Sequence, residues 1–231
     1  MGIVKHIPNT ITSMNLLCGA MGVIFTLEGR PYLAFPLMLA AAVFDFCDGL
    51  AARLLNAYSP IGKQLDSLAD MVSFGVLPSV MLLQAMGIQQ YRYICLFLAV
   101  MSALRLAKFN VDQRQESDFL GVATPTSAMI CGSLCYLIAT GTVPWLQELA
   151  ESHWFLPLVA VVLGLLLVSE IPMFGMKIKK GHKLLDTKRI VFLCLVVAAI
   201  VLTIVLGLNW SFAVLAVFVS YIVENLILAL I

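Results

Sequence analysis

Charged residues are scarce in this chain of 231 residues: they make up 12% of it, about half the share found in soluble globular domains. Hydrophobic residues make up 61%, and the mean hydropathy is +1.01. This composition excludes an ordinary soluble domain and predicts an integral membrane protein. The net charge of only +1 hides an uneven distribution of basic residues, which membrane topology and attraction to anionic head groups explain, so we expect no nucleic-acid partner.

Cysteine motifs, repeats and linkers are also missing. The six cysteines are scattered through apolar stretches without the spacing of a metal site, so we expect thiols that pack as small apolar groups and form no disulfide. No internal repeat, low-complexity run or long linker divides the sequence. We therefore predict a single integral membrane domain over residues 1–231.

Long apolar stretches dominate what is present. Crossing a bilayer as a helix takes about 20 apolar residues, and eight stretches meet that length. They lie near residues 10–28, 32–55, 63–86, 91–110, 124–143, 154–175, 188–207 and 210–230. The predicted fold class is all-α: a polytopic membrane helical bundle with about eight transmembrane helices.

The basic residues predict how this bundle is oriented. Of the 14 lysines and arginines, only Arg30 and Arg92 fall on the outer side of the membrane in the predicted topology. The others are Lys5, Arg53, Lys63, Arg105, Lys108, Arg114, Lys177, Lys179, Lys180, Lys183, Lys188 and Arg189. Because positive charge gathers on the cytoplasmic side, we expect a protein of the cytoplasmic membrane with both termini inside. The first stretch could pass for a signal peptide, but Gly19-Ala20-Met21 is a poor cleavage site, so we expect it to be retained.

Four aspartates stand out against this apolar background. Asp45 and Asp48 are spaced i,i+3 near the end of the second stretch, and Asp66 and Asp70 are spaced i,i+4 at the start of the third. On a helix each pair projects from one face. The residues between the pairs, 56–62, are rich in turn formers, which predicts a helical hairpin that brings the four carboxylates together at the cytoplasmic face.

These carboxylates predict a metal site. Four of them so close together cannot all ionise without a compensating cation, and oxygen-only ligand sets suit hard divalent ions such as Mg²⁺ or Mn²⁺. We expect Asp45, Asp48, Asp66 and Asp70 to hold two such ions, which would clamp a diphosphate and favour phosphoryl-type transfer. The alternative is that single aspartates cap helices or pair with Arg53 and Lys63.

Small residues beside Asp48 predict a slot for a ligand. Gly49 and Ala52 remove bulk from the same helix face, although small residues also permit close helix packing in membranes. Arg53 is spaced to reach the same pocket, where its guanidinium could bind a phosphate through two hydrogen bonds. Its alternative role is an anchor that extends toward the cytoplasmic interface.

The run from Asp45 to Asp70 resembles the D-x-x-D-G-x-x-A-R, eight residues, G-x-x-x-D-x-x-x-D signature of the CDP-alcohol phosphotransferase family. The resemblance implies a six-helix catalytic core, usually dimeric, in which a CDP-linked lipid loses CMP while an alcohol takes over the phosphatidyl group. It implies that all four aspartates hold divalent metal and that Asp70 is also the base. The CDP-diacylglycerol contacts that it implies are Asn9, Asp48, Gly49, Ala52, Arg53 and Gly62; Asn9 could instead be a helix N-cap.

Further segments resemble the members of this family that use serine as the acceptor. They are residues 15–19, 59–76, 105–110 and 119–125. Two positions differ from those members: they often have arginine where this chain has Lys108, and proline where it has Ala123. The resemblance implies transfer of the phosphatidyl group from CDP-diacylglycerol to the hydroxyl of L-serine. The last hundred residues carry no such similarity and are predicted to be generic apolar helices.

A serine site needs an inward cation for the carboxylate of the substrate. Arg105 and Lys108 share a helix face at i,i+3, and Asn110 and Thr124 could add polar contacts. Their alternative roles are positive-inside anchors and helix caps. Glycerol 3-phosphate and inositol phosphate stay open as acceptors, because Lys108, Arg114 and residues 177–183 could bind a further phosphate. A divalent-cation transporter is a distant alternative, since its carboxylates usually lie at the midplane between repeats.

Overall fold

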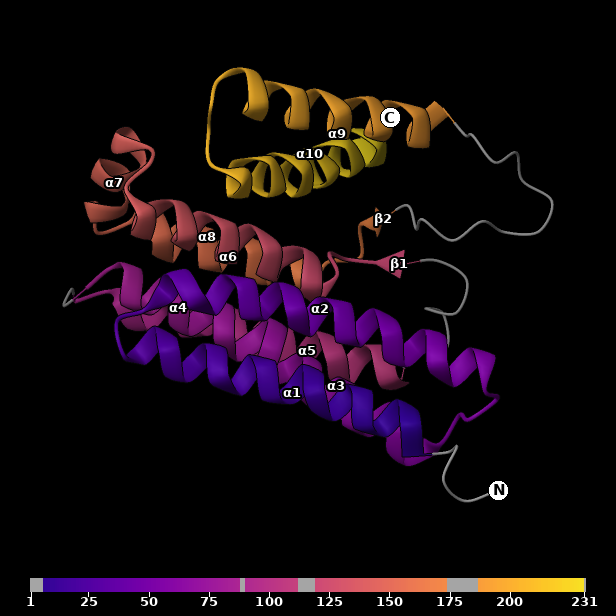
Figure 1. Cartoon of the computed structure of the whole chain (residues 1–231). Helices are drawn as coiled ribbons and strands as arrows, with labels where there is room; N and C mark the ends of the chain where they lie inside the picture. The colour runs from indigo at the N-terminus through magenta and orange to yellow at the C-terminus, as the bar shows by residue number, and fades with distance from the viewer. Residues whose placement is uncertain (1–5, 88–89, 112–118, 174–186, 231) are drawn as a thin grey trace.

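The computed structural model describes residues 6–87, 90–111, 119–173 and 187–230 (Figure 1). Their α-helices are α1 (His6–Leu27), α2 (Pro31–Leu54), α3 (Pro60–Asp70), α4 (Leu77–Ala85), α5 (Phe97–Val111), α6 (Thr124–Thr140), α7 (Pro144–Glu151), α8 (Phe155–Val168), α9 (Thr187–Val205) and α10 (Trp210–Leu230). A π-helix, η2 (Met71–Val76), joins α3 to α4, and a 3-10 helix, η3 (Arg92–Leu96), leads into α5. Two short strands, β1 (Phe119–Leu120) and β2 (Pro172–Met173), pair antiparallel.

The predicted all-α membrane bundle is confirmed. Five helical stretches are long and apolar enough to cross a bilayer: α1, α2, Pro60–Ala85, Arg92–Val111 and α10. The pair α6 and α7 would make a sixth, but the two helices are bent by 107° relative to each other. Within the described residues, α8 and the apolar part of α9 are shorter than 18 residues. The predicted count of eight is therefore not confirmed.

One predicted boundary was wrong. The stretch expected to be helical over 154–175 ends as α8 at Val168. Ser169 has an extended backbone, and Pro172 disfavours a helical conformation in the residue before it. The chain therefore leaves the helix and enters β2, where Leu120 lies opposite Pro172.

The helices pack in layers (Figure 1). α1 packs along α2 and also contacts α3, η2 and α4, whereas α6 contacts α2, α4 and α10. α9 and α10 lie together on the other side of α6 and α8 from α1. Fully buried side chains include Phe35 of α2, Phe74 of η2 and Leu98 of α5. One apolar core therefore joins most of the bundle.

The turn between α2 and α3 confirms the predicted helical hairpin. Asn56 takes the left-handed backbone conformation (φ 47°) after α2 ends. Ser59 is the N-cap of α3: its Oγ accepts a hydrogen bond of 2.9 Å from the Gly62 backbone N–H. Pro60 follows as the first helical residue, where its fixed φ favours helix initiation.

The segment before α6 is held against the end of α8 by backbone hydrogen bonds. The Gly121 N–H donates to the Ile171 carbonyl at 2.9 Å, and the Val122 N–H donates to the Leu166 carbonyl at 3.0 Å. Gly121 has a φ of +73°, and a Cβ atom on it would lie 2.6 Å from the Leu167 carbonyl oxygen. Only glycine fits this position without displacing the backbone.

Candidate active site

The aspartate pairs converge at the α2–α3 hairpin. Carboxylate oxygens of Asp45, Asp48 and Asp66 all lie within 4.8 Å of one another. Asp70 lies one turn further along α3 and is buried, and its charge acts on the other three carboxylates. The hairpin thus brings the four predicted metal ligands into one cluster.

Helix α1 supplies hydrogen-bond donors to this cluster. Thr12 Oγ1 donates to Asp48 Oδ2 at 2.5 Å, and Asn15 Nδ2 donates to Asp70 Oδ1 at 3.2 Å. The Asn15 carbonyl in turn accepts a 3.0 Å hydrogen bond from Ser73 Oγ of η2. All three polar side chains are buried, and Thr12 and Asn15 fix two carboxylates from α1.

Sequence reasoning missed Thr12 and Asn15 as parts of the site. The signal was present: buried positions 8, 12, 15, 19, 22 and 26 of α1 recur at helical spacing and carry mostly small or polar residues. Gly19 belongs to this stripe, and a Cβ atom on it would lie 2.8 Å from Ser73 Cα. The stripe is therefore the face on which α1 approaches η2 most closely.

The π-helix η2 begins directly after Asp70. Its hydrogen bonds span one residue more per turn than those of an α-helix, and such segments occur frequently at functional sites. The rotation between α3 and α4 therefore differs from that of a continuous α-helix. Asp70 can face the cluster while Phe74 and Leu77 enter the apolar core.

No aspartate of the cluster is in an ion pair with a lysine or arginine among the described residues. Arg53 is exposed and donates from Nε to the Gly49 carbonyl at 2.9 Å, and Lys63 Nζ donates to the Asn110 carbonyl at 3.4 Å. The alternative of aspartates paired with Arg53 and Lys63 is therefore not supported. Oxygen donors this close together, in no described ion pair with a lysine or arginine, fit a divalent metal ion.

The space beside Gly49, the residue that follows Asp48, is open. A Cβ atom on Gly49 would meet no described atom within 4 Å, so close packing among the described helices does not require this glycine. A Cβ atom on Gly62 would lie 2.9 Å from Ser59 Oγ and 3.0 Å from Asn9 Oδ1. Asn9 lies inside α1, so the alternative of Asn9 as an N-cap was wrong. Asn9 and Gly62 adjoin, and half-buried Ala52 lies one turn after Asp48 on α2.

Arg105 of α5 extends the site toward α6. It is buried, and its Nε donates a hydrogen bond to the Val122 carbonyl. Its Nη2 atom is buried with no hydrogen-bond partner among the described residues. The guanidinium interacts electrostatically with Asp70 and lies 5.9 Å from the centre of the Phe109 ring. Arg105 therefore offers an unused donor near the aspartate cluster.

The other predicted serine contacts have partners of their own. Lys108 Nζ lies 3.4 Å from Glu170 Oε1 in an exposed ion pair. Asn110 Nδ2 donates to Ser67 Oγ at 2.8 Å, which ties α5 to α3. Thr124 is buried as the first residue of α6. Of the four, Arg105 is the one that interacts with an aspartate of the cluster in the described part of the chain.

Several basic residues that the sequence analysis singled out lie outside the described residues. They are Lys5, Arg114, Lys177, Lys179, Lys180 and Lys183. The side chains of Lys188 and Arg189 lie outside the description as well.

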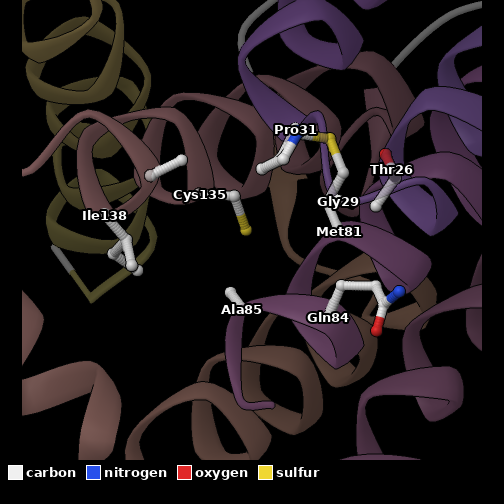
Figure 2. A pocket seen from close by; sticks show the side chains of 9 residues that line it. Thr26, Gly29, Pro31, Met81, Gln84, Ala85, Cys135 and Ile138 are labelled. Atoms are coloured by element: carbon white, nitrogen blue, oxygen red, sulfur yellow. The ribbon is translucent and has the colours of Figure 1, made fainter.

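A pocket of about 350 Å³ lies at the other end of the bundle (Figure 2). Thr26, Pro31 and Gln84 line it, together with Cys135 and further residues at the ends of α1, α4 and α6. Pro31 precedes Asp45 by 14 residues, or about 21 Å of α-helix. The pocket is therefore separate from the aspartate cluster.

Comparison with known proteins agrees with this geometry. A model of the CDP-alcohol phosphatidyltransferase family matches residues 5–168, which hold α1 to α8 and all four aspartates. The chain belongs to this family. Helices α9 and α10 lie beyond the matched residues.

Similar proteins carry the name CDP-diacylglycerol--serine O-phosphatidyltransferase. The one from Mycobacterium leprae is 35% identical over 186 residues, which are 76% of this chain and 59% of the relative. The Bacillus subtilis protein is 35% identical over 147 residues, which are 60% of this chain and 82% of the relative. The Helicobacter pylori protein is 31% identical over 194 residues, which are 82% of this chain and 80% of the relative. The chain spans about three fifths of the length of the mycobacterial relatives that it matches.

Proposed function

We propose that this protein is a phosphatidylserine synthase, which transfers the phosphatidyl group of CDP-diacylglycerol to the hydroxyl of L-serine and releases CMP. The observation that carries the proposal is the aspartate cluster next to Arg105, whose Nη2 is buried and unpartnered among the described residues. The cluster suits a diphosphate with its metal, and the guanidinium suits a carboxylate. The names of the relatives, which specify serine, support the same acceptor.

Asp45, Asp48, Asp66 and Asp70 would hold the metal, which we propose to be two Mg²⁺ or Mn²⁺ ions. Bound there, divalent ions neutralise the diphosphate and the charge that develops on the departing CMP. The carboxylates themselves stay in place because Thr12 and Asn15 hold two of them by hydrogen bonds. This arrangement supports a pre-formed ligand set.

The nucleotide side would be formed by Asn9, Asp48, Gly49, Ala52, Arg53 and Gly62. Open space beside Gly49 leaves room for a ligand against the backbone of α2. Arg53 is exposed next to that space and can exchange its bond to the Gly49 carbonyl for a phosphate. Asn9 and Gly62 adjoin at the starts of α1 and α3.

In the proposed reaction, the serine hydroxyl oxygen attacks the phosphorus that carries diacylglycerol. The bond from that phosphorus to the bridging oxygen breaks, and CMP leaves with this oxygen. The hydroxyl proton passes to the Asp70 carboxylate, which acts as general base. Asn15 orients Asp70 through its 3.2 Å hydrogen bond, and Arg105 would bind the serine carboxylate so that the hydroxyl points toward Asp70.

We also propose where the protein works. The basic residues at one end of the predicted topology favour the cytoplasmic membrane, with the aspartates and both termini on the cytoplasmic side. The 231 residues would form one catalytic unit. The family resemblance further implies a homodimer.

One assay tests the function. Purified protein in lipid nanodiscs receives CDP-diacylglycerol and Mn²⁺ or Mg²⁺, and CMP release is measured with serine, glycerol 3-phosphate or inositol phosphate offered separately. Serine-dependent CMP release, with phosphatidylserine as the lipid product, is the expected result. CMP release that responds only to a phosphorylated alcohol would overturn the serine assignment and keep the family chemistry.

A further inference from the structure

Helix α10 is apolar enough to cross a bilayer, yet it carries several buried polar residues. Ser211, Glu224 and Asn225 are buried, and Tyr221 is half-buried against the core. Polar side chains inside a membrane-spanning helix are costly and mostly serve a function. Because α10 lies beyond the residues that match the family, the family signature assigns these side chains no role.

Aromatic contacts fix the register of α10 beside α2. The Trp210 ring stacks on Phe35 with a centroid distance of 5.4 Å and an interplanar angle of 4°. Both helices run from this contact toward the same end of the molecule (Figure 1). Tyr221 follows Trp210 by 11 residues and Asp45 follows Phe35 by 10, or about 16 Å and 15 Å of helix. Tyr221 therefore lies at the depth of the aspartate cluster.

Tyr221 also lies within electrostatic range of Arg105. The tyrosine and the guanidinium interact electrostatically although 116 positions separate them. The Tyr221 ring is held edge-on by Phe192 of α9, with a centroid distance of 5.6 Å and an angle of 70°. This contact and the packing on the core hold Tyr221 within electrostatic range of a buried guanidinium whose Nη2 has no described partner.

We propose that α10 completes the acceptor pocket: the Tyr221 hydroxyl and Arg105 Nη2 together bind the carboxylate of the acceptor. The inference rests on the proposed function and deepens it by adding a residue that selects the acceptor. Two donors at one carboxylate favour serine over an alcohol that has an ammonium group and no carboxylate. Tyr221 takes no part in binding CDP-diacylglycerol.

The substitution Tyr221→Phe tests this role, because it removes the hydroxyl and keeps the ring that packs on Phe192. We expect the KM for serine to rise about threefold to tenfold, as for the loss of one hydrogen bond, with the KM for CDP-diacylglycerol unchanged. Ser220→Ala is the matched control: Ser220 is the neighbouring residue, and among the described residues its hydroxyl bonds only to the Val217 carbonyl of its own helix. The control should leave both KM values unchanged.

Serinamide, which lacks the negative charge of serine, gives a second readout. The wild-type preference for serine over serinamide, as a ratio of kcat/KM values, should fall about threefold to tenfold in Tyr221→Phe. In the double variant with Arg105→Gln, the loss should be smaller than the product of the single losses, because both groups act on one carboxylate.

The outcomes separate the two proposals. Wild-type protein that releases no CMP with serine overturns the proposed function, and the role of Tyr221 with it. Active wild-type protein with an unchanged serine KM in Tyr221→Phe overturns the role of Tyr221 alone. A rise in the KM for CDP-diacylglycerol without a change for serine also overturns it, since the hydroxyl would then act on the donor side.

Discussion

The Thr12 hydroxyl donates a 2.5 Å hydrogen bond to Asp48 Oδ2. This contact joins α1 to the aspartate cluster, and both side chains are buried. A donor on one carboxylate oxygen fixes the plane of the carboxylate and leaves the other oxygen for a cation. A threonine outside the family signature thereby positions one of the four predicted metal ligands.

Removing this donor should weaken metal activation. We expect Thr12→Val to raise the Mn²⁺ concentration for half-maximal CMP release about tenfold, since hydrogen bonds to charged groups contribute about 1.5 to 3 kcal/mol. Thr12→Ser keeps the hydroxyl and serves as the control. A metal titration of both variants checks this, and a wild-type response in Thr12→Val would rule out the positioning role.

Asp70→Asn should abolish turnover while CDP-diacylglycerol binding persists, because the amide has nearly the same shape and cannot accept the proton. Asp45→Asn and Asp66→Asn should weaken metal binding as well. Binding of labelled CDP-diacylglycerol is measured alongside CMP release. Near-normal CMP release with serine in Asp70→Asn would show that Asp70 is not the base.

Arg105→Ala should raise the serine KM about tenfold to a hundredfold, the effect of losing a charge-assisted hydrogen bond near the metal. Lys108→Ala, one turn away, should change it much less, because Lys108 pairs with Glu170 in an exposed ion pair and such pairs contribute little. Separate titrations of serine and CDP-diacylglycerol distinguish the two. If Arg105→Ala affects only the CDP-diacylglycerol KM, Arg105 belongs to the donor side.

Gly121→Ala should lower the stability of the fold by about 1 to 3 kcal/mol. Its Cβ atom would crowd two carbonyl oxygens, those of Leu167 at 2.6 Å and Ser169 at 2.8 Å. Gly207→Ala is the control, because Gly207 also has a positive φ (+61°) but no described atom lies within 4 Å of the added Cβ. Thermal unfolding in detergent compares the variants. Equal losses in both would mean that φ alone, and not the crowding, sets the cost.

Metal removal should abolish CMP release, and added Mg²⁺ or Mn²⁺ should restore it. Metal should also raise the Tm of the wild-type protein, because a cation relieves repulsion among Asp45, Asp48 and Asp66 and binds the native state only. The Tm of Asp45→Asn should rise less. If added metal left the Tm of the wild-type protein unchanged, the result would contradict an aspartate metal site.

The hairpin and the aspartate cluster could be predicted because they depend on local rules. Spacings of three and four residues set which face of a helix Asp45, Asp48, Asp66 and Asp70 occupy, and turn formers set where the helix ends. The helical spacing of positions 12 and 15 indicates only that they share a face of α1, whereas their contacts with aspartates 36 and 55 positions away depend on how α1 packs against α2 and α3. Both were missed.

The predicted acceptor residues show the same limit of local spacing rules. Arg105 and Lys108 share a helix face, as predicted, yet one interacts with Asp70 and the other pairs with Glu170. Spacing cannot distinguish them, because their partners come from distant segments. The last hundred residues were expected to be generic apolar helices, and one tyrosine in an apolar helix gives no sequence signal that it lies within electrostatic range of Arg105.

The pairing of β1 with β2 has a consequence for how this family can diverge. Backbone hydrogen bonds hold residues 121–122 against residues 166–171, and apart from the requirement for glycine at position 121 they do not depend on which side chains these segments carry. The aspartates lie on other elements, α2 and α3. Side-chain substitutions in these two segments can therefore accumulate during evolution without breaking the backbone hydrogen bonds that join them, and the proposed acceptor side can vary separately from the aspartates.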